Sequence, residues 1–179
     1  MRPSRTRKYY PKKYYAGLSK TQKAKRYKEI QHFGKLPWKS PKAYKGFKTD
    51  KHVKTKTSSY VQQLSRKLKK LGYDPTKTKS LKAKAKATGV PLKYLKTCYN
   101  RGMAAWRTGH RPGATEQQWG YARVASLLVC GKTAKGPFKP TKGRRKGTFP
   151  PAKLAGPDAD IVRNARKQSS SANRWWKNC

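Results

Sequence analysis

The chain has 179 residues, with 47 Lys and Arg against 6 Asp and Glu, so its formal net charge is +41 at pH 7. This charge makes the isolated molecule repel itself and predicts an acidic partner, either nucleic acid or acidic protein. The hydrophobic share of 34% is low for a globular domain, yet 11% of the residues are aromatic. No stretch approaches the roughly 18 apolar residues of a membrane span, and no secretory signal follows the basic start. We therefore expect a mainly α protein, with a small helical centre between long extended basic arms that become ordered on a partner.

The N-terminal part, 1–57, is predicted to be a basic, aromatic-rich arm with one helix at about 19–31. Ser19 and Gln22 have the spacing of a capping box, in which each side chain binds the backbone N–H of the other residue. This helix carries few apolar residues, so we expect it to lie on the surface of a partner.

Gly and Pro residues break any regular helix between residues 32 and 56. Trp38 and Tyr44 are interspersed with lysines in this segment. One interpretation is that the aromatic rings bury against a partner while the lysines bind its acidic groups. The other interpretation is a solvated linker. Trp38 and Tyr44 are kept as candidate partner-binding residues.

Residues 58–131 are predicted to form a central helical domain. Leu64 and Leu68 lie on one face of its first helix at helical spacing. Thr115 and Gln118 have the spacing of a second capping box. Glycines mark several of the helix ends. The helices are expected at 58–71, 80–88, 91–107 and 116–130.

The last part, 132–179, is predicted to be a second basic arm, rich in Pro and Gly. These residues exclude a regular helix until Asp158, which is expected to cap a short helix through about residue 168. Trp175 and Trp176 follow near the end of the chain. We expect this aromatic pair to anchor the arm on a partner without affecting the central domain.

The residue types that support catalysis are scarce in this sequence. Acid–base catalysis and metal-assisted hydrolysis need clustered carboxylates, whereas the six acidic residues are spread along the chain. No nucleotide-binding loop, nucleophile elbow or zinc-protease motif is present. His110 lies in a Gly- and Pro-containing turn, which favours a structural role. The three cysteines lack the short spacing of a zinc site and favour a reducing compartment. We therefore expect no enzymatic activity, no cofactor and no metal.

A helix-turn-helix pattern is centred on Gly89. Ala85 allows two helices to approach, Gly89 permits the turn, and Val90, Leu95 and Cys98 occupy buried positions. The alternative is an ordinary helical hairpin in a small α domain. The candidate nucleic-acid contacts of the second helix are Lys93, Lys96 and Asn100. Two arginines of the C-terminal arm, Arg144 and Arg145, are further candidates.

The most distinctive block of the sequence is 99–124. It contains R-G-x-x-A-[WY] at 101–106, G-x-R-P at 109–112 and Q-W-G-x-A-R at 118–123. With G-L-S-K-x-Q at 17–22, this block resembles small basic virion proteins of large nucleocytoplasmic DNA viruses, especially those of algae. The resemblance implies a minor capsid protein in the inner layer of the capsid. Its implied partners are the major and other minor capsid proteins, with viral DNA and an acidic internal membrane surface as further partners.

Within this block, Trp106 and Trp119 are predicted to pack together across the turn at 109–113 and to fix the angle between two helices. Arginine stacks on indole rings and binds carboxylates through two N–H groups, so the neighbouring arginines would make this two-helix knuckle rigid. The candidate partner-binding residues of the block are Arg101, Trp106, Arg107, His110, Arg111, Trp119 and Arg123.

Two functions remain open from the sequence. In the first, the protein is a structural minor capsid protein that cements its neighbours through basic and aromatic arms. In the second, it is a nucleic-acid-binding or genome-packaging protein of the virion. Aromatic anchors dominate protein interfaces and favour the first function, although stacking on single-stranded bases uses the same residues. The composition alone also fits a ribosomal protein.

Overall fold

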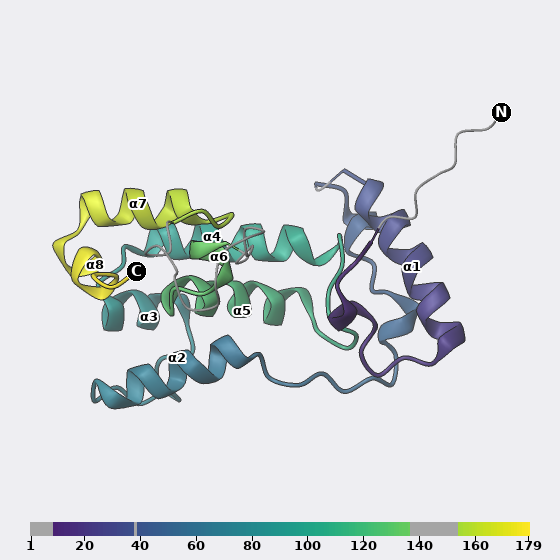
Figure 1. Ribbon diagram of the computed structural model, residues 1–179, viewed down its shortest axis with the longest axis horizontal. Coiled ribbons are helices and arrows are strands. Elements are labelled where there is room, and N and C mark those ends of the chain that lie inside the picture. Colours follow the sequence, from purple (N-terminus) through teal and green to yellow (C-terminus); the bar gives the residue numbers. More distant parts are fainter. Residues whose placement is uncertain (1–8, 38, 137–153) are drawn as a thin grey trace, which may run out of the picture. The chain divides into compact units, whose positions relative to one another are not determined.

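The computed structural model describes residues 9–37, 39–136 and 154–179, and within them every regular element is a helix (Figure 1). The prediction of a mainly α protein is therefore confirmed. The α-helices are α1 (Lys20–Lys35), α2 (Ser59–Lys70), α3 (Leu81–Thr88), α4 (Leu92–Trp106), α5 (Glu116–Leu128), α6 (Lys132–Lys135), α7 (Ala159–Gln168) and α8 (Ser170–Trp175). Three short 3-10 helices are η1 (Lys12–Tyr15), η2 (Pro41–Tyr44) and η3 (Lys48–Asp50). In the described part of the chain, no helix is long and apolar enough to cross a membrane.

The helix ends follow the local sequence signals. Ser19 and Gln22 form the reciprocal capping box at the start of α1. Thr115 and Gln118 exchange the equivalent two hydrogen bonds, at 3.1 Å each, at the start of α5. Both predicted capping boxes are confirmed. Helix α3 ends at Gly89, which has the left-handed conformation (φ +68°) that favours glycine.

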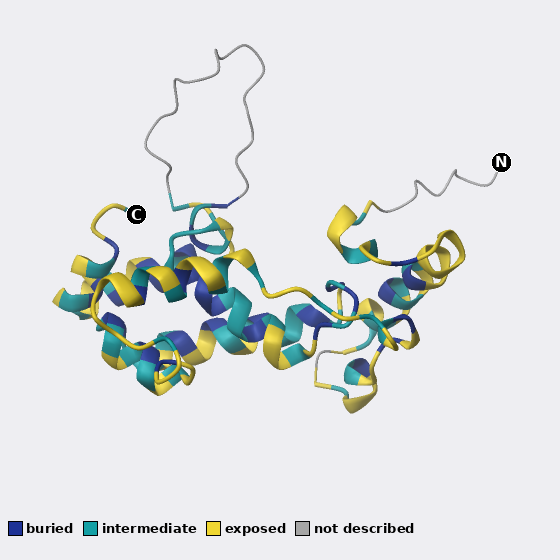
Figure 2. Cartoon of the chain, turned by 90° about the horizontal axis from the view of Figure 1, so that it is seen from below, coloured by how far each residue is buried: buried dark blue, intermediate teal, exposed yellow. Residues whose placement is uncertain are grey.

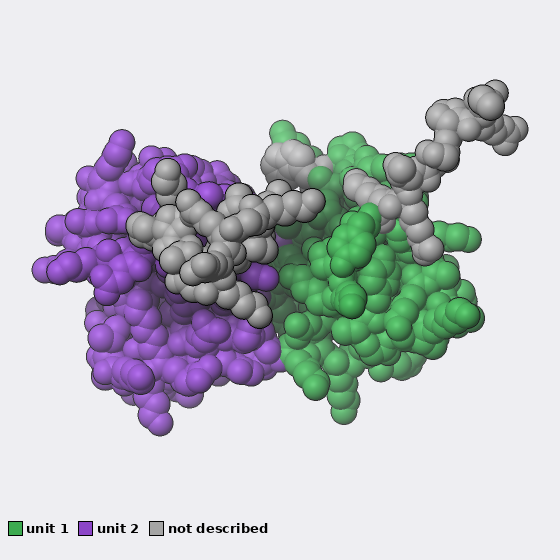
Figure 3. Space-filling model, viewed as in Figure 1, with its two compact units in different colours: residues 1–56, 103–119 green, residues 57–102, 120–179 purple. Residues whose placement is uncertain are grey.

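The chain folds into two compact units (Figure 3). Unit 1 comprises residues 1–56 and 103–119, and unit 2 comprises residues 57–102 and 120–179. This division differs from the expected central domain with two arms. Helix α4 begins in unit 2 and its last four residues belong to unit 1, while α5 begins in unit 1 and continues in unit 2.

Unit 1 has a small core built around Ile30, Phe47 and Trp106. Phe47 stacks on Phe33 with 4.7 Å between ring centroids. The sequence predicted that this helix lies on the surface of a partner. Instead, α1 contributes Ile30 to this core, so one face of the helix covers residues of its own chain. The described part of the expected N-terminal arm is thus folded, because segments distant in the sequence supply its apolar contacts.

Unit 2 has a larger core, most of it aliphatic. Its buried residues are dark blue in Figure 2. The expected C-terminal arm is corrected for residues 154–179, because α7 and α8 pack into this core. Trp176 is 1% exposed and donates from Nε1 to the carbonyl of Leu127 at 3.2 Å. Trp176 therefore packs inside unit 2, whereas the sequence had predicted that it anchors the arm on a partner. Cys130 and Cys179 form a disulfide, which corrects the expectation of reduced cysteines, and Cys98 is free and buried.

Glycines allow very close packing at one point in unit 2, between α4 and α5. A Cβ atom on Gly102 would lie 2.7 Å from the Cα atom of Gly120. A Cβ atom on Gly120 would in turn lie 2.7 Å from the ring of Tyr99. A side chain at either position would force the two helices apart, so this pair sets their spacing.

Candidate nucleic-acid interface

The turn between α3 and α4 is held by local hydrogen bonds. Ser80 caps α3 by accepting from the backbone N–H of Ala83 at 3.0 Å. At the other end, the Thr88 hydroxyl donates to the carbonyl of Lys84 at 2.8 Å. Gly89 then reverses the chain so that α4 starts three residues later, at Leu92. A short helix, a tight turn and a longer second helix are the parts of a helix-turn-helix.

The burial pattern of this segment matches the helix-turn-helix prediction. Val90, Leu95 and Cys98 are at most 1% exposed and belong to the core of unit 2. An ordinary hairpin also buries alternate faces of its helices, so burial of these three residues alone does not separate the two interpretations. A further feature of this segment is the exposed polar face of α4.

One face of α4 is exposed over two turns and carries polar side chains. Lys93, Lys96, Thr97 and Asn100 are all exposed. Residues at these spacings of three and four lie above one another on a helix. This face therefore presents two ammonium groups and one side-chain amide together, and no acidic residue lies among these positions.

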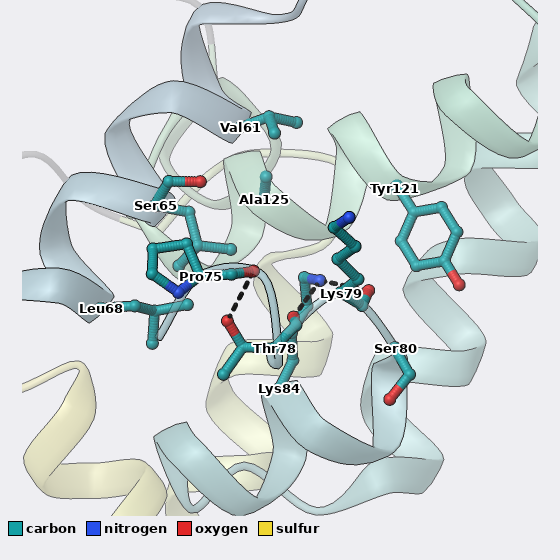
Figure 4. A pocket seen from close by; sticks show the side chains of 11 residues that line it. Val61, Ser65, Leu68, Pro75, Thr78, Lys79, Ser80, Lys84, Tyr121 and Ala125 are labelled. Atoms are coloured by element: carbon teal, nitrogen blue, oxygen red, sulfur yellow. Dashed lines mark hydrogen bonds between the residues drawn. The ribbon is translucent and has the colours of Figure 1, made fainter. Parts of the chain in front are cut away.

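Lys84, on the first helix of the pair, has a structural role that the sequence did not indicate. It is 8% exposed, and its Nζ donates to the carbonyls of Thr78 at 2.7 Å and Lys79 at 2.5 Å (Figure 4). Burial lowers the pKa of this ammonium to about 8. It borders a cavity of about 440 Å³ whose other lining includes Leu64 and Tyr121. By binding these two carbonyls, Lys84 holds the loop that precedes α3 in place.

Helix α8 packs against the turn of the helix pair. The Ser169 hydroxyl donates to the carbonyl of Gly89 at 3.0 Å. A Cβ atom on Gly89 would collide with the Cβ atom of Ser171. The turn is thus held from both sides, by the core of unit 2 and by the C-terminal segment.

In unit 1, the arginine and carboxylate of a buried ion pair are joined by a histidine. Arg26 is 0% exposed, and its NH1 donates to Asp50 Oδ1 at 2.7 Å. Its NH2 donates to the carbonyl of His110 at 2.8 Å. His110 Nε2 lies 2.8 Å from Asp50 Oδ2. This network joins α1, η3 and the turn before α5.

The titration of this network follows from its contacts. Burial lowers the pKa of Arg26, and the nearby Asp50 carboxylate opposes that effect. Burial by itself raises the pKa of Asp50, but hydrogen bonding and charge from His110, the charge of Arg26 and the N–H of Gly113 outweigh it. The pKa of Asp50 is therefore held below its usual value. Asp50 is consequently a charged structural acceptor in the folded unit.

Trp106 and Trp119, which the sequence predicted to pack on each other, both contact the ring of His110 in unit 1. The His110 ring stacks on Trp106 with 4.1 Å between centroids and lies edge-on to Trp119 at 6.4 Å. Both ring nitrogens of His110 face oxygen acceptors, since Nδ1 lies 2.9 Å from the Trp106 carbonyl. Trp106 Nε1 donates to the carbonyl of Ala114 at 2.7 Å. Trp106 is buried and Trp119 is partly buried, so these rings hold unit 1 together and are not a free binding surface.

Arg107 and Arg111 also bind within unit 1. Arg107 NH1 donates to the carbonyl of Leu36 at 2.8 Å and to that of Gly34 at 3.2 Å, and so caps the end of α1. A cation at this position is favoured by the helix dipole. Arg111 NH1 makes a longer contact of 3.4 Å with the carbonyl of Lys56.

Arg101 and Arg123 meet two acids in unit 2. Asp158 is 0% exposed and accepts from Arg123 Nε at 2.8 Å and from Arg123 NH2 at 2.9 Å. Arg101 binds Asp160 with NH1 at 2.8 Å and NH2 at 2.7 Å. Hydrogen bonding to Asp160 raises the pKa of Arg101, and the Arg101 guanidinium lowers the pKa of Asp160. The sequence predicted that Arg123 binds a partner, whereas in the structure it binds an acid of its own chain.

The remaining candidates fall in different places. Tyr44 lies in η2 and packs against the core of unit 1. Trp175 is partly buried and donates from Nε1 to the carbonyl of Leu128 at 2.8 Å. Three candidates lie outside the described residues, namely Trp38, Arg144 and Arg145.

The comparisons place the helix pair within a larger matched region. A model of a family of unknown function, DUF5824, matches residues 11–145. The chain belongs to this family. The DUF5824 match includes the helix pair and the Arg26–Asp50–His110 network but ends before α7, so Asp158 and Trp176 lie beyond it. Searches of curated proteins and of solved structures returned no match.

No metal centre is formed by the described ranges. Within residues 9–37, 39–136 and 154–179, no group of three His, Cys, Asp or Glu side chains is placed to hold a metal ion. The exposed lysines of the helix pair are Lys82 and Lys86 on α3 and Lys93 and Lys96 on α4.

Proposed function

We propose that the protein binds double-stranded DNA through the helix pair α3–α4, with α4 entering the major groove. The observation that carries the proposal is the exposed face of α4, on which Lys93, Lys96 and Asn100 stand together while Leu95 and Cys98 bury the opposite face. The second helix of a helix-turn-helix uses this arrangement to reach base edges.

The residue types on this face suit the major groove. Lysine donates to the O6 and N7 acceptors of guanine, and asparagine pairs with the N6 and N7 atoms of adenine. The groove is about 12 Å wide, which admits an α-helix with its side chains. Asn100 is the residue of this set that best distinguishes bases, because its amide both donates and accepts a hydrogen bond.

The charge of the chain supports the same partner. A formal charge of +41 favours a polyanion, and phosphate contacts supply affinity that does not depend on sequence. On α3, Lys82 and Lys86 are exposed. In a helix-turn-helix the first helix crosses the DNA backbone, so these two lysines are suited to phosphate contacts.

The test is a triple variant, Lys93→Ala, Lys96→Ala and Asn100→Ala, in the full chain. Preferred duplexes are first selected from a random library, and affinity is then measured for preferred and scrambled DNA. We expect the variant to lose about 5- to 150-fold of discrimination for each good base contact removed. All three side chains are exposed, so circular dichroism should match that of the parent.

The matched control is Lys82→Ala with Lys86→Ala on the first helix. This double variant should weaken binding to all duplexes equally and reduce the salt dependence, because it removes only phosphate contacts. If the α4 variant behaves in the same uniform way, or if the parent selects no preferred sequence, base reading by α4 is excluded.

The minor capsid role implied by the sequence resemblance is a second proposal. It is supported by three exposed large apolar side chains, Tyr9 at 80%, Leu71 at 54% and Tyr73 at 40% exposed. Leu71 and Tyr73 lie two residues apart just after α2, and apolar side chains of this kind suit a protein interface. Locating the chain in intact particles, either at the shell or with the genome, distinguishes this role from the first.

A further inference from the structure

Helix α1 in unit 1 has two faces of different character. Arg26 and Ile30 are 0% and 1% exposed and face the interior of the unit. At 3.6 residues per turn, Lys25, Lys28 and Lys35 lie on the opposite side, and all three are exposed. The buried side fixes the helix, so the exposed side is presented in a defined orientation within unit 1.

The exposed side of α1 carries no negative charge. The single acid of the helix, Glu29, is already bound within the unit, because it accepts from the backbone N–H of Lys48 at 2.7 Å and from the Thr49 hydroxyl at 2.5 Å. No ion pair joins the exposed lysines to an acid in the described part of the chain. The net charge of this surface is therefore positive.

The spacing of the charges fits a phosphate backbone. On the exposed side of α1, the stretch from Lys25 through Lys28 to Lys35 spans about 15 Å along the helix axis. One strand of B-DNA carries a charge about every 3.4 Å, so a backbone segment of that length offers about four phosphates. The other two lysines of α1, Lys20 and Lys23, are also exposed but lie outside this side of the helix.

We infer that the exposed side of α1 is a second DNA-binding surface, which binds the phosphates of double-stranded DNA irrespective of sequence. This inference rests on the proposed DNA-binding function. It assigns different tasks to the two units, since α4 in unit 2 selects the site and α1 in unit 1 adds salt-dependent affinity. The side chains of α1 that carry the inference are lysines, which bind phosphate as point charges without reading bases.

The experiment replaces Lys25, Lys28 and Lys35 with Gln in the full chain. Glutamine is a good helix former, so α1 should persist. The logarithm of the binding constant is measured against the logarithm of salt concentration. The slope should fall in magnitude by about 2–3, since each lost phosphate contact removes about 0.9. Discrimination between preferred and scrambled duplexes should stay unchanged.

The control replaces three exposed lysines of α2 and α7 with Gln, and so removes the same charge. These lysines are Lys69, Lys70 and Lys167. An equal fall in slope for both variants would mean that only net charge matters, and would overturn the inference. An α1 variant that binds DNA like the parent but loses binding to polyglutamate would also overturn it, in favour of an acidic protein partner.

The α4 triple variant in the same assay separates the two proposals. If it loses discrimination while the α1 variant keeps the parental slope, the helix pair binds DNA and the second surface does not exist. If the α1 variant loses slope while the α4 variant keeps its discrimination, phosphate binding by unit 1 stands and base reading by α4 fails.

Discussion

Unit 1 and unit 2 are stabilised by different proportions of apolar and charged side chains. The core of unit 1 has three buried apolar residues, Ile30, Phe47 and Trp106, and its interior also holds the fully buried Arg26 and His110. The core of unit 2 has fifteen buried residues, most of them aliphatic, and one of them, Cys98, contacts the fully buried carboxylate of Asp158 at 3.5 Å. Charged side chains therefore make up a larger share of the interior of unit 1 than of unit 2.

A single carboxylate connects most of the network of unit 1. Asp50 accepts from Arg26, lies within hydrogen-bond distance of His110 and accepts from the N–H of Gly113 at 3.0 Å. The chain has only six acids, and Asp50 is the one that forms an ion pair with the buried Arg26. A buried pair contributes little relative to an apolar replacement, but removal of one partner leaves an uncompensated buried charge.

The largest effect that we expect is from Asp50→Asn. Loss of the carboxylate leaves Arg26 buried without its counter-charge, which should cost about 3–5 kcal/mol and unfold unit 1 locally. Hydrogen exchange of α1 amides measures this effect, and α2 amides in unit 2 serve as the reference. The control is Asp74→Asn, because Asp74 is exposed and its side chain accepts from the nearby Thr76 in the same turn. Full protection of α1 in Asp50→Asn would show that the aromatic cluster alone holds unit 1.

The same carboxylate gives unit 1 a pH dependence of known sign. The pKa of Asp50 is lower in the folded unit than in the unfolded chain, so its contribution is present above the ordinary pKa of aspartate, about 3.9. That contribution is lost as the pH falls through the folded-state pKa. Acid should therefore reduce the protection of α1, and Asp50→Asn should lack this part of the pH dependence.

Alanine substitutions at two glycines, Gly72 and Gly89, test how tightly unit 2 is packed, and we expect a smaller loss of stability from them. Gly72 and Gly89 both have positive φ values, +79° and +68°, so alanine at either position costs about 1–2 kcal/mol in backbone strain. A Cβ atom on Gly72 meets nothing within 4 Å, whereas one on Gly89 collides with Ser171. Gly89→Ala should therefore lower the melting temperature more than Gly72→Ala. Equal shifts would mean that α8 yields easily and that unit 2 is not tightly packed there.

The local features of the fold could be predicted from the sequence. Helix α2 is observed at Ser59–Lys70 and α4 at Leu92–Trp106, close to the predicted 58–71 and 91–107. The capping boxes and the turn at Gly89 depend on residues within four positions of one another. Such short patterns can be recognised in the sequence. The burial of Val90, Leu95 and Cys98 followed from the same short pattern.

The pairings across the chain could not be predicted from the sequence. Arg26 binds Asp50 across 24 positions and the His110 carbonyl across 84, and no periodicity links such residues. The sequence predicted no role for Asp50. It predicted that Asp158 caps α7, whereas the Asp158 side chain makes no cap hydrogen bond and accepts from Arg123. The scarcity of acids was the available signal, because each acid in so basic a chain is a candidate counter-ion for a buried arginine.

The smallest effect that we expect is from Asp160→Asn, and it tests whether charge matters less in unit 2. The side chains of Arg101 and Asp160 are 38% and 47% exposed, so water screens the pair and its loss should cost about 0–1 kcal/mol. Asp158→Asn is the matched comparison in the same cluster, because Asp158 is fully buried against Arg123. Thermal unfolding of both variants should give a clearly larger loss for Asp158→Asn. If Asp160→Asn destabilised the protein as much as Asp158→Asn, even the exposed pairs of unit 2 would be required for its fold. The distinction between a charge-dependent unit 1 and an aliphatic unit 2 would then fail.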